Sequence, residues 1–192
     1  MQLNESSSDC RKQRHHWAGW LLLLGLATPA AHAQQLANEP VQQLDLKRYL
    51  GQWHEIAHLP MFFQSQSVDN ISATYTSLPD GRVGVHNACR TRDGSMDAAD
   101  GVARSTGKAA GALEVRFAPS WLGWLPWVWA DYWVLDLDPD YRWVVVGSPS
   151  RDYLWVLSRD THMQRTQYEA LRQRAAQRGY PVEKLVISAP LD

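Results

Sequence analysis

The sequence predicts an all-β fold, an eight-stranded antiparallel up-and-down barrel with a C-terminal α-helix packed on its outside. Eight short β-rich runs follow one another between residues 53 and 158, with turn residues between them and no helical pattern. Consecutive strands without crossover helices favour an antiparallel meander, and eight strands are enough to close one around a small ligand. After Arg159 the pattern changes to that of a helix.

The first 33 residues have the organisation of a secretory signal peptide. Basic residues precede an apolar run at 17–27, and Ala31-His32-Ala33 offers a cleavage site between small residues. An uncleaved membrane anchor is disfavoured, because about a dozen apolar residues are fewer than the roughly twenty that span a bilayer. We therefore expect export, with residues 1–33 removed, residues 34–45 as a loose leader and residues 46–192 as one domain.

The composition excludes some classes of function. The chain carries 19 Lys and Arg against 20 Asp and Glu, and three of the basic and two of the acidic residues lie in the signal peptide. The mature chain is thus weakly acidic and has no nucleic-acid footprint. It keeps Cys89 but not Cys10, which excludes an intramolecular disulfide. We expect Cys89 to be a buried small side chain, with intermolecular pairing as the alternative, and we expect no cofactor.

Turn residues and alternation define the strands. Pro79-Asp80-Gly81 is a turn signal, because Pro presets φ and Gly tolerates a positive φ. Residues 83–91 alternate between two different faces with a period of two, as in a strand. We expect strands at 53–59, 71–78, 83–91, 101–108, 112–118, 132–138, 142–147 and 153–158.

The C-terminal region has the signature of a helix. Residues 163–178 are rich in helix formers, with an apolar strip of Tyr168, Leu171 and Ala175. Gly179 is a suitable stop for this helix. A last apolar stretch at 185–187 predicts one more short strand.

Three sequence elements occur in a characteristic order. Gly51-Gln52-Trp53 heads the first strand, residues 137–142 follow the sixth, and Arg159 closes the eighth. This ordered set resembles the lipocalin family, and residues 49–57 are similar to its bacterial outer-membrane branch. The resemblance implies that Trp53 packs at the closed end of the barrel with Arg159 across it, a cation–π contact worth about 0.5–2 kcal/mol. Gly51, Trp53 and Arg159 are therefore expected to be structural.

The resemblance implies a lipid-binding transport protein and not an enzyme. Such a carrier moves or stores fatty acids or lysophospholipids in the cell envelope and so supports membrane maintenance. Bacterial members are often anchored to the outer membrane through a lipidated cysteine, but no cysteine follows the apolar run here. We therefore expect a soluble periplasmic protein with peripheral contact to the outer membrane. Alternation and family position predict ligand contacts for Glu55, Tyr75, Val85, Asn87, Tyr132 and Val134.

A competing motif overlaps the first strand. Residues 54–58 read His-Glu-Ile-Ala-His and satisfy H-E-x-x-H, which on a helix binds zinc through both histidines, with the glutamate as general base. On a strand, however, His54 and His58 lie about 13 Å apart at roughly 3.3 Å per residue, too far to share one zinc ion. A zinc metalloprotease using His54, Glu55 and His58 is the alternative function. A barrel that serves as an interaction or structural module in the envelope is a third.

Apolar residues gather in two loops that an up-and-down meander places at the open end. A contiguous exposed apolar patch usually marks an interaction site, and tryptophan suits a membrane interface. We expect these residues to contact a membrane or the ligand. Folding back over the cavity and a homodimer contact are the alternatives. The residues are Phe62, Phe63, Trp121, Trp124 and Trp127.

Overall fold

The computed structural model describes residues 35–61, 67–117, 125 and 128–192. The expected signal peptide and the five aromatic residues expected at the open end lie outside the described residues. No helix in the described part of the chain has the length and apolarity needed to cross a membrane. The strands are β1 (Gly51–His58), β2 (Ser67–Ser77), β3 (Val83–Thr91), β4 (Met96–Ser105), β5 (Ala112–Arg116), β6 (Ala130–Leu137), β7 (Trp143–Gly147), β8 (Leu154–Ser158) and β9 (Val186–Ile187).

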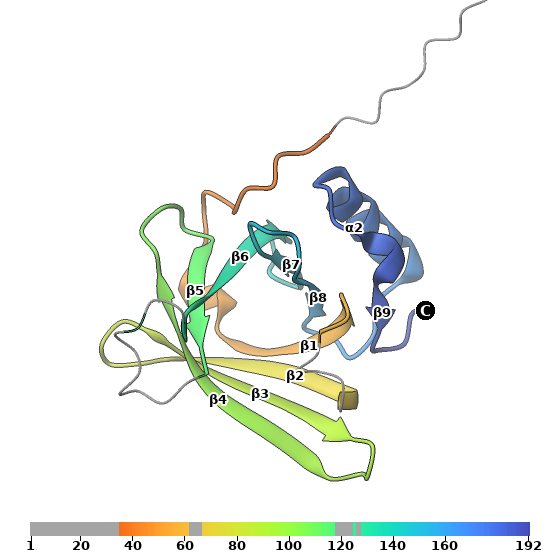
Figure 1. Ribbon diagram of the computed structural model, residues 1–192, viewed down its shortest axis with the longest axis horizontal. Coiled ribbons are helices and arrows are strands. Elements are labelled where there is room, and N and C mark those ends of the chain that lie inside the picture. Colours follow the sequence, from red (N-terminus) through yellow and green to blue (C-terminus); the bar gives the residue numbers. More distant parts are fainter. Residues whose placement is uncertain (1–34, 62–66, 118–124, 126–127) are drawn as a thin grey trace, which may run out of the picture. The chain divides into compact units, whose positions relative to one another are not determined.

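The strands form one antiparallel sheet in the order β2-β3-β4-β5-β6-β7-β8-β1-β9. Because β1 also pairs with β2, strands β1 to β8 close into a barrel (Figure 1). The predicted eight-stranded antiparallel barrel is confirmed. The largest boundary difference is at β4, which begins at Met96 and not at residue 101. Its first five residues are exposed, so they lack the apolar alternation on which the prediction relied.

Strand β1 is shared between two neighbours along one edge. Its first half, from Gly51 to His54, pairs with β2, whereas Ala57 and His58 pair with β9. The β1–β8 register shifts between Glu55 and Ala57, which marks a β-bulge. The short strand expected near the C-terminus is therefore present, and it extends the sheet beyond the barrel.

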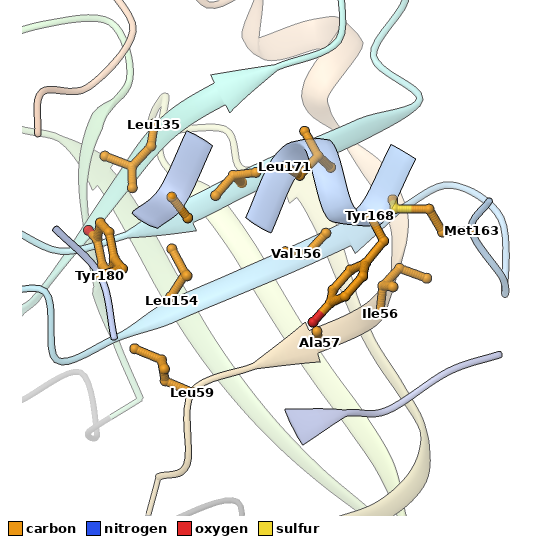
Figure 2. Close-up of a cluster of buried hydrophobic side chains, with 12 residues drawn as sticks. Ile56, Ala57, Leu59, Leu135, Leu154, Val156, Met163, Tyr168, Leu171 and Tyr180 are labelled. Carbon is orange, nitrogen blue, oxygen red and sulfur yellow. The ribbon is translucent and has the colours of Figure 1, made fainter. Parts of the chain in front are cut away.

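Helix α2 (Arg165–Gln177) packs on the outside of the barrel, as predicted. Its apolar strip, Tyr168, Leu171 and Ala175, is buried against strand residues that include Ile56 and Val156 (Figure 2). A second apolar cluster fills the inside of the barrel. The two clusters explain why strands such as β7 are apolar on both faces, since one face meets the helix and the other meets the lumen.

Arg159 closes one end of the barrel. Its guanidinium carbon lies 3.8 Å from the centre of the Trp53 ring. Its nitrogens donate hydrogen bonds to five backbone carbonyls, those of Arg48, Tyr49, Leu50, Gln52 and Tyr141. Several of these carbonyls belong to or follow the short helix α1 (Leu46–Tyr49), which the sequence analysis missed. Asp45 caps this helix by accepting hydrogen bonds from the amides of Lys47 and Arg48.

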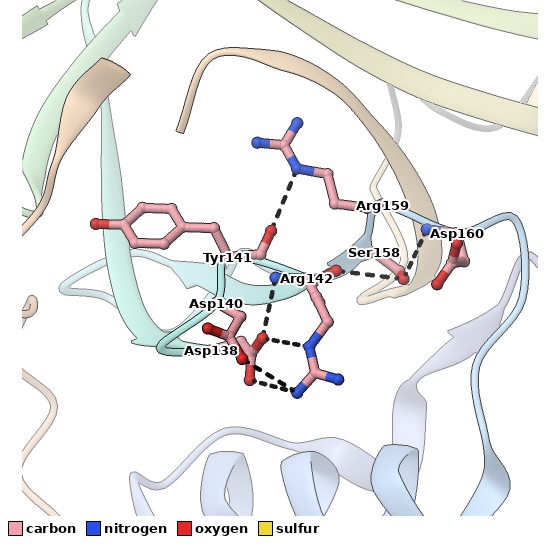
Figure 3. A network of polar contacts seen from close by, with 7 residues as sticks. All are labelled: Asp138, Asp140, Tyr141, Arg142, Ser158, Arg159 and Asp160. Carbon is pink, nitrogen blue, oxygen red and sulfur yellow. Dashed lines mark hydrogen bonds and ion pairs between the residues drawn. The ribbon is translucent and has the colours of Figure 1, made fainter. Parts of the chain in front are cut away.

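The turn between β6 and β7 lies beside Arg159 (Figure 3). The Asp138 carboxylate accepts hydrogen bonds from the backbone and side chain of Arg142. The bond from the Arg142 side chain is the main reason why the pKa of Asp138 lies below its usual value. The carbonyl of Tyr141 accepts from Arg159, so this turn is tied to the closed end.

The segment before the domain is bound to the barrel and is not loose. The Leu36 amide donates to the carbonyl of Gln177 in α2, and the Asn38 side chain donates to the carbonyl of Ser148. The Val41 amide donates to the Val134 carbonyl, and the Gly111 amide donates to the Val41 carbonyl. Most of these bonds are made by backbone groups, so apolar periodicity does not reveal them.

Candidate ligand-binding site

The described residues enclose an apolar cavity of about 10 Å³ inside the barrel. Tyr75, Val85 and Tyr132, three of the residues predicted to contact the ligand, line it. Val134, a fourth, is fully buried in the same interior cluster. The structure thus places these four side chains in the lumen, and their ligand-binding role stays a prediction.

The lumen is filled near Arg159 by the large side chains of Trp53 and Tyr49, and its wall residues are more exposed in the other direction. Along β3, Val83 and Val85 are buried, and Asn87 and Cys89, next on the same strand face, are partly exposed. Across from them on β4, Ala103 is buried and Ala99 is exposed. The interior side chains therefore become more accessible toward the end that carries the loops after β1, β3, β5 and β7.

Three tyrosine hydroxyls form a chain inside the barrel. The hydroxyl of Tyr132 is hydrogen-bonded to those of Tyr49 at 2.6 Å and Tyr75 at 2.8 Å. The ring of Tyr49 lies 5.3 Å from the ring of Trp53 and 5.4 Å from that of Tyr75, measured between centroids. We call Tyr49, Tyr75 and Tyr132 the tyrosine crossbar.

The tyrosine crossbar is neutral. Burial raises the pKa of Tyr75 to about 12. Burial, reinforced by the neighbouring tyrosines, also raises the pKa of Tyr49 and of Tyr132 well above the usual value. The low-dielectric interior disfavours a phenolate, so this part of the lumen is uncharged at any physiological pH.

Asn87 provides a polar atom further toward the open end. Its Oδ1 is buried and has no hydrogen-bond partner among the described residues. Leaving a buried acceptor unpaired costs about 1–3 kcal/mol, so such an atom calls for a partner. Asn87 was predicted to contact the ligand, and its unpaired oxygen, in a less buried part of β3 than Val85, is suited to a polar contact.

Glu55, the sixth predicted contact, is buried but belongs to another cluster. Its Oε1 accepts a hydrogen bond from the Ser188 hydroxyl at 2.6 Å and lies 2.7 Å from Nδ1 of His58. These contacts join β1 to the residue after β9. Glu55 is not among the residues that line the cavity described above.

The geometry of the first strand does not support zinc binding. His54 and His58 lie on β1, an extended strand, and not on a helix. Within the described residues, no group of three or more His, Cys, Asp or Glu side chains could hold a metal ion. The zinc metalloprotease alternative therefore has no support.

Part of the cavity wall was not predicted from the sequence. Leu46 and Tyr49 belong to α1, where no alternation of period two points to the lumen. A signal was nevertheless present, because Tyr49 is a large aromatic residue four positions before Trp53 and lies outside the alternating pattern of the strand. The remaining wall residues that were not predicted come from the faces of β3, β4 and β5, namely Val83, Ala103, Leu113 and Val115.

The apolar segment after β5 is fixed at its C-terminal end. The side chain of Trp129 stacks against two guanidinium groups, with centroid distances of 3.9 Å to Arg104 and 5.1 Å to Arg116. At the other end, the Phe117 ring lies over Gly101, where a Cβ atom would approach the ring to 2.8 Å. Phe117 remains 44% exposed at this edge of the barrel.

Comparisons with known proteins agree with this architecture. Residues 44–190 match the family model described as a lipocalin-like domain. The chain is 41% identical over 150 residues to temperature-induced lipocalin-1 of Arabidopsis thaliana, covering 77% of this chain and 80% of the relative. It is 35% identical over 148 residues to the outer membrane lipoprotein Blc of Citrobacter freundii, covering 76% and 79%. Insecticyanin from the tobacco hornworm Manduca sexta has a similar fold, with a TM-score of 0.60, 19% identity and coverage of 80% and 85%.

Proposed function

Because the chain belongs to the lipocalin family, whose members bind and transport small hydrophobic ligands, we propose that it carries a fatty acid or a lysophospholipid in its lumen. The observation that supports this most directly is the closed barrel whose interior is apolar near Arg159 and whose wall residues become more exposed toward the other end. The proposed activity is binding and release, without chemistry on the ligand.

The ligand's acyl chain enters the lumen from the open end, and its polar group stays toward that end. Burial of an acyl chain against the lumen walls supplies about 25 cal/mol per Å² of apolar surface. Asn87, whose Oδ1 has no hydrogen-bond partner among the described residues, is the proposed polar contact on the wall that the chain passes. Tyr75, Val85, Tyr132 and Val134 belong to the apolar wall of the lumen, whereas Glu55 is not among the residues that line the described cavity.

The proposed place of action is the cell envelope. Residues 1–33 have the features of a signal peptide, which would deliver the domain to the periplasm. The bacterial relative is named as an outer membrane lipoprotein, in agreement with such a location. A peripheral contact with the outer membrane would suit lipid exchange and membrane maintenance.

The apolar loops at the open end are the proposed membrane contact. Phe62, Phe63, Trp121, Trp124 and Trp127 belong to the two segments that follow β1 and β5. The second segment ends at Trp129, which is stacked on Arg104 and Arg116. Aromatic side chains beside guanidinium groups suit the interface between lipid headgroups and acyl chains.

A single purification tests the proposed function. The mature domain is isolated without detergent and extracted with organic solvent, copurified lipids are identified by mass spectrometry, and zinc is measured on the same sample. We expect one fatty acid or lysophospholipid per chain and no zinc. A domain that contains no lipid and takes up none of a series of fatty acids would contradict the proposal.

A further inference from the structure

The tyrosine crossbar spans the lumen. In the closed barrel, β2 and β6 are separated by β3, β4 and β5 on one side and by β7, β8 and β1 on the other. They therefore face each other across the barrel. Tyr75 on β2 and Tyr132 on β6 meet through their hydroxyls at 2.8 Å. Tyr49 reaches the same hydroxyl of Tyr132 from α1.

The crossbar is held in place by contacts at the closed end of the barrel. The ring of Tyr49 packs against Trp53, and Trp53 is covered by the guanidinium of Arg159. Arg159 also binds the carbonyl of Tyr49 itself. Displacing the rings would break buried hydrogen bonds, each worth about 1 kcal/mol net and more when a partner is left unpaired. An apolar chain offers no replacement for those bonds.

The space around the crossbar does not admit a ligand. The cavity of about 10 Å³ lies among the three tyrosines, and its other lining residues are Leu46, Val83, Val85, Ala103, Leu113 and Val115. It is thus at the level of the crossbar, since Val85 pairs directly with Tyr75. Such a volume is about the minimum that holds one water molecule. An acyl chain that enters from the open end therefore stops at the rings.

We infer that the tyrosine crossbar is the floor of the ligand site and sets the longest acyl chain that the lumen accommodates. This inference rests on the proposed function, since it concerns the ligand of the same lumen. Each methylene above the floor gains about fourfold in affinity from burial. A chain that is too long for the site must leave its last methylenes in water, and its affinity gains nothing from them.

A chain-length series tests the floor. Dissociation constants are measured for decanoic, dodecanoic, tetradecanoic, hexadecanoic and octadecanoic acid with the natural chain and with Tyr132→Ala, whose truncation joins the small cavity to the lumen. For the natural chain, we expect affinity to rise about fourfold per methylene and then to level off at one length. In Tyr132→Ala the levelling should move to longer chains. Tyr75→Ala provides a second variant from the opposite wall if the first does not fold.

Two controls separate ring size from other effects. Tyr132→Phe keeps the ring and loses the hydroxyl, so its break point should match that of the natural chain. Tyr168→Ala removes a buried tyrosine of equal size outside the lumen, between α2 and the barrel, and should also leave the break point unchanged. If the natural chain binds the series but the break point is the same in both alanine variants, the floor is elsewhere and the proposed function still stands. If the natural chain binds no acid of the series, the proposed function itself fails.

Discussion

Arg159 shows at the scale of one residue how the closed end is held. Its planar group stacks on Trp53 while its nitrogens reach five carbonyls, which no other side chain could do with the same geometry. We expect Arg159→Ala to lower the free energy of unfolding by roughly 2–4 kcal/mol, and Arg159→Lys to recover only part of the loss. Urea unfolding followed by tryptophan fluorescence measures this. A lysine variant as stable as the natural chain would show that the charge alone suffices.

The tyrosine crossbar makes the stability of the fold depend on pH in the alkaline range. The pKa of Tyr75 is raised to about 12, against about 10 in the unfolded chain, so folding favours the protonated phenol. The corresponding stability is present in full below pH 10 and is lost as the pH rises from about 10 to about 12. We expect absorbance of the phenolate band to show that these tyrosines ionise only together with unfolding. Complete ionisation of all seven tyrosines in a domain that keeps its circular dichroism would contradict this expectation.

At the scale of an element, the segment before α1 acts as a strap on the barrel. Val41 lies between the backbone of Gly111, just before β5, and that of Val134 in β6. A Cβ atom on Gly111 would come within 2.7 Å of Cγ2 of Val41 and 3.0 Å of the Val134 carbonyl oxygen. We therefore expect Gly111→Ala to destabilise the domain by about 1–3 kcal/mol, as overpacking does. The measurement is thermal unfolding.

A second substitution shows whether the strap is the cause. Val41→Ala removes the methyl group that the new Cβ would strike, so the double variant should be less destabilised than the two single losses added together. Simple additivity would mean that the backbone of Gly111, and not the strap, is responsible.

At the scale of the whole molecule, ligand binding and folding are linked. A ligand that binds only the closed barrel stabilises it by about 2.7 kcal/mol at a free concentration of a hundred times its dissociation constant. We expect the melting temperature to rise with the concentration of a long-chain fatty acid and to be unaffected by zinc. A melting temperature that is independent of the fatty acid, in a sample shown to be free of copurified lipid, would argue against a lumenal ligand.

The sequence by itself determined the barrel, its closed end and three of the nine residues that line the described cavity. Alternation with a period of two located most strands, because burial of one strand face leaves a local pattern, and alternation together with family position placed Tyr75, Val85 and Tyr132 in the lumen. The apolar strip of α2 did the same for the helix. Trp53 and Arg159 lie together as the family resemblance implied.

Only the tertiary structure decided which polar groups meet. Tyr49 and Tyr132 are 83 residues apart, and Glu55 and Ser188 are 133 apart, so no local pattern could pair them. The same reason applies to the strap, whose partners in β6 and α2 are distant in the chain. Periodicity reports which face of an element is buried, whereas a hydrogen bond between distant residues depends on how the barrel closes and where each strand stands in its register.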